Sequence, residues 1–237
     1  MSAVTETKTA IDQTEIAAWA HQFEGQPVEA LLDWAVERFV PKLVMTSSFG
    51  PEGIVLLDKL SRVAPQTPVI FLDTGFHFAA TYEVKEQVRE RFGLNLIEQQ
   101  AALSVAEQEA QYGKALHMHQ PDVCCRLRKV EPLKDALAGY HGWLSALRRD
   151  QASTRAHIAK VEWNAKHQLV KLNPLADWTR AQVWNYLVRH KLPYNRLHDV
   201  GYTSVGCEPC TRPVARGAHE RSGRWVGQGK VECGIHL

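Results

Sequence analysis

The cysteines are the residues of this 237-residue sequence best suited to chemistry. Cys124 and Cys125 are adjacent, and Cys207 and Cys210 form a C-x-x-C pair. Four thiolates can hold a zinc ion or an iron–sulfur cluster, although a Cys-Cys dipeptide is unusual for either metal. Buried free thiols would explain one or two cysteines but explain two pairs poorly, and a redox C-x-x-C alone would leave the Cys-Cys pair without a purpose. The two pairs therefore predict a metal centre.

The fifth cysteine is a candidate nucleophile. Cys233 lies in the terminal segment VECGIHL, three residues before His236, where a core residue is not expected. Nearby positive charge favours a thiolate. Residues 126–237 supply that charge, with 19 Lys and Arg against 9 Asp and Glu, whereas residues 1–125 carry 9 against 17. The alternative is a terminal thiol without a role.

Many of these cations are close in sequence to the cysteines. Guanidinium groups bind phosphate or sulfate oxygens through two parallel hydrogen bonds, so the set predicts an anionic ligand. The alternative is scattered, solvated surface charge. No RNA- or DNA-binding signature is present, and we expect no nucleic-acid partner. The residues concerned are Arg126, Arg128, Lys129, Arg148, Arg149, Arg155, Arg212, Arg216, Arg221 and Arg224.

The elements that must position these residues alternate between strands and helices in the first half of the chain. Such alternation is typical of a parallel sheet covered by helices. Two helices come first, one following a cap at Thr14 and one opened by Pro27. The later elements are expected to be strands over residues 42–46, 68–72 and 94–97, and helices over residues 54–63 and 78–92.

Regular structure is harder to predict in the second half. Pro132 is expected to bend the first helix there, and Asp177 or Thr179 to cap the second. Gly and Pro become frequent after Lys191. The expected elements are helices over residues 126–138 and 179–190, and strands over residues 142–147 and 168–172.

Two loops follow the first two expected strands. Ligands of open α/β sheets bind at the carboxyl ends of strands, where helix N-termini attract phosphate. Ser47, Ser48 and Gly50 in the loop SSFGPEG could contribute hydroxyl groups and close backbone approach, but the loop has neither the Walker nor the dinucleotide pattern. Asp73 in LDTG could face the same crevice. The alternatives are plain turns, with an Asx cap at Asp73 and a local hydrogen bond at His77.

Together these motifs resemble the assimilatory sulfonucleotide reductases, and among them the bacterial adenosine 5′-phosphosulfate reductases. The resemblance runs from about Lys42 to the C-terminus and depends on the order of SSFG, LDTGFHF, CCRLRKVEPL, RRDQ, GCEPCTRP and ECGIH. It implies a single α/β domain with a mostly parallel sheet flanked by helices. The implied fold is that of adenine-nucleotide α-hydrolases, related to the PP-loop ATP pyrophosphatases, with a mobile C-terminal tail.

The resemblance also implies a cofactor and a substrate. In that family the two cysteine pairs hold a 4Fe–4S cluster, so the ligands here would be Cys124, Cys125, Cys207 and Cys210. Such a cluster is expected to order the site and shape its electrostatics rather than to transfer electrons. Reductases acting on 3′-phosphoadenosine phosphosulfate typically lack these cysteines, so adenosine 5′-phosphosulfate is the expected substrate. The 3′-phosphorylated nucleotide, or both nucleotides, are the alternatives.

The reaction implied by the resemblance uses Cys233 as nucleophile, with His236 as the other catalytic residue. Cys233 attacks the sulfur of the phosphosulfate, AMP leaves, and thioredoxin or a glutaredoxin-like protein releases sulfite from the S-sulfocysteine. Ser47, Ser48 and Gly50 would contact the phosphate, and the Leu72–Thr74 backbone would meet the adenine. The residues matching phosphosulfate-binding positions are Lys129, Arg221, Arg224 and His236, and Arg128 and Arg149 are expected to contact nucleotide or cluster.

The expected organisation is an N-terminal helical segment over residues 1–40, the α/β domain over residues 41–220 and a catalytic tail over residues 221–237. Two competing functions remain open. An ATP-dependent adenylating or tRNA-thiolating enzyme would need the loop Ser-Gly-Gly-x-Asp-Ser, which is absent from residues 47–53. An iron–sulfur or zinc regulator that senses adenine nucleotides would not need Cys233.

Composition supports a globular protein, with 45% hydrophobic and 23% charged residues. No apolar run is long enough to span a membrane, and the segment MSAVTETKTAIDQTE lacks the features of a secretory signal. An odd number of cysteines argues against a disulfide framework. We therefore expect a cytoplasmic protein with no membrane partner. The resemblance adds an expected homo-oligomer and a separate protein as electron donor.

Overall fold

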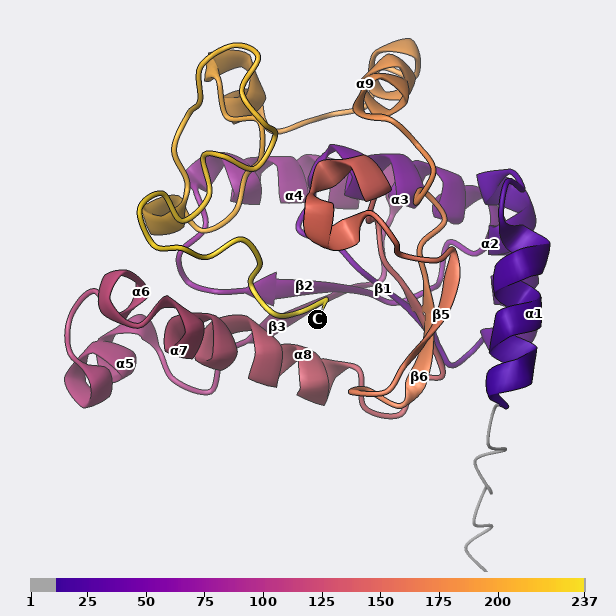
Figure 1. Ribbon diagram of the computed structural model, residues 1–237, viewed down its shortest axis with the longest axis horizontal. Coiled ribbons are helices and arrows are strands. Elements are labelled where there is room, and N and C mark those ends of the chain that lie inside the picture. Colours follow the sequence, from indigo (N-terminus) through magenta and orange to yellow (C-terminus); the bar gives the residue numbers. More distant parts are fainter. Residues whose placement is uncertain (1–11, 237) are drawn as a thin grey trace, which may run out of the picture.

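Six strands form one sheet, in the order β3-β2-β1-β4-β6-β5, in the computed structural model, which describes residues 12–236 (Figure 1). All neighbouring strands are parallel except β5 and β6. The mostly parallel sheet predicted from the alternation of elements is therefore confirmed. The strands are β1 (Leu43–Thr46), β2 (Val69–Asp73), β3 (Leu96–Gln100), β4 (Gly142–Leu144), β5 (Val161–Asn164) and β6 (Leu169–Leu172).

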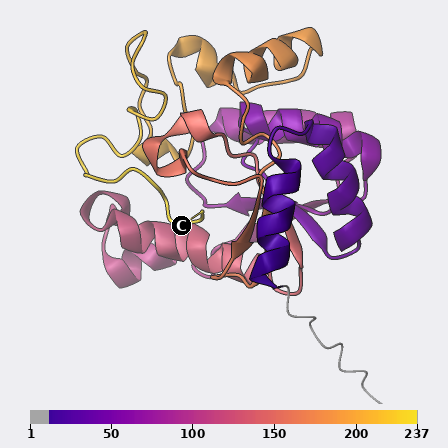
Figure 2. The ribbon, with the colours of Figure 1, turned by 45° about the vertical axis from the view of Figure 1, so that its right-hand side comes forward.

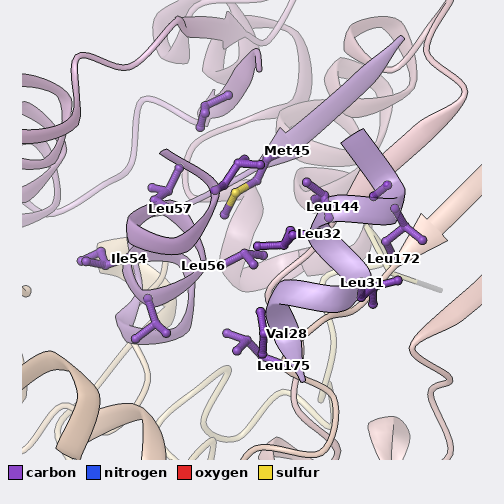
Figure 3. Close-up of a cluster of buried hydrophobic side chains, with 14 of the residues drawn as sticks. Val28, Leu31, Leu32, Met45, Ile54, Leu56, Leu57, Leu144, Leu172 and Leu175 are labelled. Carbon is purple, nitrogen blue, oxygen red and sulfur yellow. The ribbon is translucent and has the colours of Figure 1, made fainter. Parts of the chain in front are cut away.

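Helices cover both faces of the sheet. α2 (Val28–Phe39), α3 (Pro51–Val63) and α4 (Ala79–Phe92) lie on one side, and α8 (Glu131–Ala136) lies on the other (Figure 1). Side chains alternate along the strands, so Met45 joins the core under α2 and α3, whereas its neighbour Val44 joins the core under α8. Figure 3 shows the first core, where α2 and α3 pack on β1, β4 and β6 through Leu32, Leu56, Met45, Leu144 and Leu172.

Helix ends follow capping chemistry, with one correction. α1 (Gln13–Phe23) begins after Asp12, whose side chain accepts a hydrogen bond from the backbone N–H of Thr14, with Glu15 completing the capping box. The expected cap at Thr14 is wrong because Asp12 already satisfies the free N–H groups. α9 (Arg180–Arg189) is capped by Thr179, one of the two expected caps, and Gly93, with φ of 58°, is the C-cap of α4.

The segment before α8 is less regular than the expected helix. α7 (Pro121–Cys125) runs into a π-helical turn, η1 (Arg126–Val130), and α8 starts at Glu131. Backbone angles stay in the right-handed helical region across both junctions, so the three elements form one continuous helix, and the π-helical turn directly precedes Pro132. A proline inside a helix removes a backbone donor and disturbs the turn before it, which agrees with this irregularity. The sequence pattern also did not predict α5 (Val105–Tyr112), α6 (Leu116–His119) or the edge strand β5.

Both ends of the described chain pack on the sheet domain. α1 contacts β5, and the C-terminal segment (yellow) loops out beside α6 and α7 and returns toward the sheet (Figures 1 and 2). Within residues 12–236, no helix has the length and apolarity to cross a bilayer. The start of the expected N-terminal segment, residues 1–11, and the last residue of the expected tail, Leu237, lie outside the described residues.

Candidate active site

A cavity lies where the carboxyl ends of the central parallel strands meet. It measures about 210 Å³ and takes its walls from Thr46 at the end of β1, Leu72 on β2 and Ser145 after β4. This is the edge at which open α/β sheets bind ligands. The C-terminal tail adds Cys233, Ile235 and His236 to the cavity lining. Two sequence motifs far apart in the chain therefore share one site.

The loop after β1 is shaped for an anion. Ser47, Ser48 and Gly50 all line the cavity, and Gly50 is the N-cap of α3. The Ser47 hydroxyl accepts a hydrogen bond from the backbone N–H of Phe49 (3.0 Å), which has φ of 57°. A Cβ on Gly53 would come within 2.7 Å of the Ser47 oxygen. The loop thus presents hydroxyl groups and a helix N-terminus to the cavity.

The loop after β2 contributes less than the sequence suggested. Leu72 lines the cavity, but the Asp73 carboxylate accepts bonds from the Gly75 N–H (2.9 Å) and the Tyr82 hydroxyl (2.7 Å). Asp73 therefore forms an Asx turn and does not line the cavity. His77 shares a hydrogen bond with the Leu72 carbonyl (3.0 Å), and burial together with the charges of Lys129 and Arg224 lowers the pKa of His77 to about 4.

Cations also line the cavity. Among them are Lys129, Arg155, Arg221 and Arg224. Burial alone would lower the pKa of Lys129, but the neighbouring sulfurs of Cys207 and Cys233 raise it. Among residues 12–236, the buried Nε atoms of Arg221 and Arg224 have no hydrogen-bond partner. The wall therefore offers both charge and unused donors to an anionic ligand.

The tail is held against the cavity by its last residues. Glu232 pairs with Arg155 and Arg221, and His236 stacks on Trp143 with ring centroids 5.5 Å apart. Burial and the charges of Lys171, Arg155 and Arg221 hold the pKa of His236 well below its usual range. His236 is consequently a neutral ring when the tail is docked.

The two cysteine pairs meet at a second, small cavity. Cys124, Cys125, Cys207 and Cys210 all line it, and all are free thiols within the described chain. An isolated bridge pairs the backbone of Cys207 with that of His77, and Thr74 lies with its hydroxyl 3.4 Å from the Cys207 sulfur. The GCEPC turn is thereby held against the loop after β2.

The thiols border a space instead of converging on one point. Among residues 12–236, no group of three or more His, Cys, Asp or Glu side chains could hold a single metal ion. Burial raises the pKa of Cys124 to about 11 and of Cys125 to about 12. Lys129 and Arg224 border both cavities and place positive charge beside the sulfurs. Four free thiols with compensating cations fit a multi-atom cluster bound by thiolates.

Arg128 and Arg149, which were expected to contact nucleotide or cluster, do not line the first cavity. Arg149 is absent from the cavity lining, and its guanidinium makes two hydrogen bonds to Glu24, of 2.7 and 2.8 Å. Arg128 lines the cysteine cavity, where it donates to Gln108 (2.7 Å) and lies over the Phe76 ring. Arg128 therefore lies with the thiols, whereas Arg149 ties the sheet domain to the segment after α1.

Several site residues were not singled out from sequence. Arg155, which lines the cavity, was one cation among many in the sequence, and Glu232, which accepts a hydrogen bond from Arg155, was not predicted. Arg148 is fully buried and pairs with Glu52, Asp150 and Glu220. The sequence does contain a signal for Glu232. An acidic residue next to a candidate nucleophile, in a tail rich in cations, is expected to form an ion pair.

Comparison with known proteins gives a consistent result. A family model described as "Phosphoadenosine phosphosulfate reductase domain" matches residues 42–213. A "Phosphoadenosine 5'-phosphosulfate reductase" of Gloeobacter violaceus is 51% identical over 95% of both chains. An "Adenosine 5'-phosphosulfate reductase" of Bacillus cytotoxicus is 48% identical over 92% of this chain and 94% of the relative.

Solved structures agree with this result. The crystal structure of phosphoadenylyl-sulfate reductase from Candida auris, a phosphate complex, matches with a TM-score of 0.76 and 31% identity, over 86% of this chain and 98% of that one. FMN adenylyltransferase of Candida glabrata matches with a TM-score of 0.59 and 17% identity, over 89% of this chain and 71% of that one, and so shares the fold alone.

Proposed function

The chain belongs to the phosphoadenosine phosphosulfate reductase family, and on that premise we propose that it reduces adenosine 5′-phosphosulfate to sulfite and AMP. It is a sulfonucleotide reductase of sulfate assimilation. One observation carries the proposal: a cavity at the ends of the parallel strands combines the thiol of Cys233 with the cations Lys129, Arg221 and Arg224. No other described thiol lines that cavity.

The first half-reaction is attack by the Cys233 thiolate on the sulfur of the phosphosulfate. A bond forms between the two sulfur atoms, the sulfur–oxygen bond breaks, and AMP leaves with its electron pair. Attack by an anion on an anionic group needs cationic compensation, which Lys129, Arg221 and Arg224 supply. The hydroxyl groups and helix N-terminus of the loop at Ser47–Gly50 would hold the phosphate.

The second half-reaction needs a dithiol protein, for which thioredoxin is the proposed donor. Its thiolate attacks the Cys233 sulfur, and sulfite leaves with the electron pair of the sulfur–sulfur bond. A second thiol of the donor then resolves the mixed disulfide and regenerates Cys233. The donor is oxidised by two electrons, which balances the reduction of the sulfonate to sulfite. Cys233 must therefore become accessible to a protein after the first step.

A 4Fe–4S cluster is proposed at the second cavity, with Cys124, Cys125, Cys207 and Cys210 as its ligands. Such a group supplies a fixed local charge and a rigid link between the chain segments that carry its ligands. Lys129 and Arg224 lie between the two cavities and can interact with groups in both. The same four cysteines favour adenosine 5′-phosphosulfate over its 3′-phosphorylated analogue, which is the alternative substrate.

The decisive experiment measures the intact mass of anaerobically purified protein mixed with adenosine 5′-phosphosulfate in the absence of thioredoxin. We expect a gain of one sulfonate group on Cys233, removed by reduced thioredoxin with release of sulfite. Cys233→Ser is the matched control and should gain nothing. A parallel sample with the 3′-phosphorylated nucleotide tests substrate choice. Protein with its full iron and sulfide that forms no adduct with either nucleotide would contradict the mechanism.

A further inference from the structure

Glu232, the residue immediately before Cys233, is a buried carboxylate with every oxygen engaged. It is 7% exposed. Arg155 donates from Nε to Oε1 (2.7 Å) and from Nη2 to Oε2 (2.8 Å). Thr154 donates to Oε1 (3.2 Å) and Arg221 to Oε2 (3.1 Å). Two cations and a hydroxyl thus fix one tail side chain beside the nucleophile.

The receiving side also has contacts that do not involve the tail. Arg155 ends the short 3₁₀ turn η3 (Ser153–Arg155), and its third nitrogen donates to Gln151 (2.6 Å). The same Gln151 oxygen accepts from the backbone N–H of Arg148 (3.1 Å). Arg148 is itself fully buried among carboxylates. Arg155 is therefore also held by its own loop, independently of the tail.

The segment that leads to Glu232 is built differently. Gly227 and Gly229 have φ of 80° and 63°, and Val226 and Val231 are 63% and 61% exposed. The docked part is short: Glu232, then Gly234, whose carbonyl accepts from Lys166 (3.1 Å), then His236 on Trp143. An exposed glycine-containing loop thus precedes a short docked segment that starts with the buried Glu232.

We propose that Glu232 is a positioning residue whose ion pair with Arg155 seats Cys233 in the cavity for the first half-reaction and opens for the second. This inference depends on the two half-reactions proposed above. A buried ion pair that loses one partner leaves an unpaired charge, so breaking it shifts the tail strongly toward release. Attack on the sulfonucleotide needs the seated tail, whereas attack by a donor protein needs the released one.

Seating can be measured without chemistry, by hydrogen–deuterium exchange of residues 226–236 in the full-length, anaerobically purified protein. Glu232→Gln keeps the shape of the side chain but removes its charge, and we expect tail exchange to accelerate by about tenfold or more. Glu83→Gln is the matched control, because Glu83 makes an exposed ion pair with Arg196 (3.1 Å). Equal exchange in Glu232→Gln and the control would overturn the proposal.

The half-reactions then separate a positioning role from a structural one. In Glu232→Gln, adduct formation should be slower than in wild type by about tenfold or more. Release of sulfite from the preformed adduct by reduced thioredoxin should be as fast as in wild type or faster. Glu232→Asp, which keeps the charge, should recover part of the adduct rate. Equal slowing of both half-reactions would overturn the proposal. Failure of the wild-type protein to form adduct would refute the proposed function, while the exchange result would still report on the ion pair.

Discussion

His236 lies parallel to Trp143, with an angle of 14° between the ring planes. Trp143 is fully buried on β4, and its Nε1–H donates to the Thr46 hydroxyl (2.8 Å). His167 meets the Trp143 ring edge-on, and Lys171 lies 5.4 Å from its centroid. The described chain therefore ends as part of the packing around a central strand, and this packing fixes where Cys233 lies.

Substituting His236 should separate stacking from hydrogen bonding. His236→Phe keeps an aromatic ring on Trp143, whereas His236→Ala removes it. Because an aromatic pair contributes about 0.5–1.5 kcal/mol beyond buried area, we expect His236→Ala to form adduct about 2- to 10-fold more slowly than His236→Phe. Single-turnover mass spectrometry measures both rates. Equal rates for the two variants, both below that of wild type, would mean that the imidazole nitrogens and not the stacked ring determine the rate of adduct formation.

Acid should weaken tail docking through His236. Its pKa is below 6.5 in the docked tail and returns toward 6.5 when the tail is released, so the released form binds the proton more readily. Docking is fully favourable above about pH 6.5 and is progressively lost as the pH falls below that value.

The check is the ratio of adduct-formation rates of wild type and His236→Phe between about pH 8 and pH 5.5. Any pH dependence that the two proteins share cancels in the ratio. We expect the ratio to fall in acid. A ratio independent of pH would show that His236 does not titrate between the docked and released tail.

Iron binding should depend on four cysteines and not on the fifth. Cys207→Ser removes a thiol from the second cavity, and we expect anaerobically purified protein to lose most of its iron, sulfide and visible absorbance. Cys233→Ser should keep about four iron atoms per chain, because that thiol lines the other cavity. Iron retained in Cys207→Ser, or lost in Cys233→Ser, would contradict the assigned ligands.

Arg149 should matter little for the reaction. It pairs with Glu24 at the surface, and partly exposed pairs of this kind contribute about 0–1 kcal/mol. We expect Arg149→Gln to lower the free energy of unfolding by no more than that and to form adduct at close to the wild-type rate. Arg221→Gln changes a residue that lines the cavity and should strongly slow adduct formation. Chemical denaturation and single-turnover kinetics measure the two effects. Slow adduct formation by Arg149→Gln would indicate that Arg149 contributes to the active site.

Much of the fold was predictable because buried strands have a strong pattern. β1 and β2 are buried hydrophobic runs followed by Gly-containing loops, and each was placed within a residue or two. β3 is half exposed, so its bounds were predicted too early in the chain. α5 was missed because only one of its residues, Gln108, is buried. Its helix is stabilised by the capping box at Ser104 and by tertiary contacts.

The site was predictable in its residue types but not in its pairings. The cysteines, Lys129 and the tail follow from motif content, and the structure brings them to two adjoining cavities. The Arg155–Glu232 pair joins residues 77 positions apart, and no local pattern distinguishes Arg155 from Arg149. Only the chain path through the 3₁₀ turns decides which arginine faces the cavity.

The contact between α1 and β5 has a consequence for truncation. In the described part of the chain β5 pairs only with β6, so its other edge carries backbone groups that could pair with a strand of another molecule. A chain trimmed to the matched residues 42–213 would lose α1 beside that edge strand, and with α2 it would lose Leu31 and Leu32 from the core. We expect such a fragment to aggregate by strand addition, so the N-terminal helices belong to the smallest stable unit.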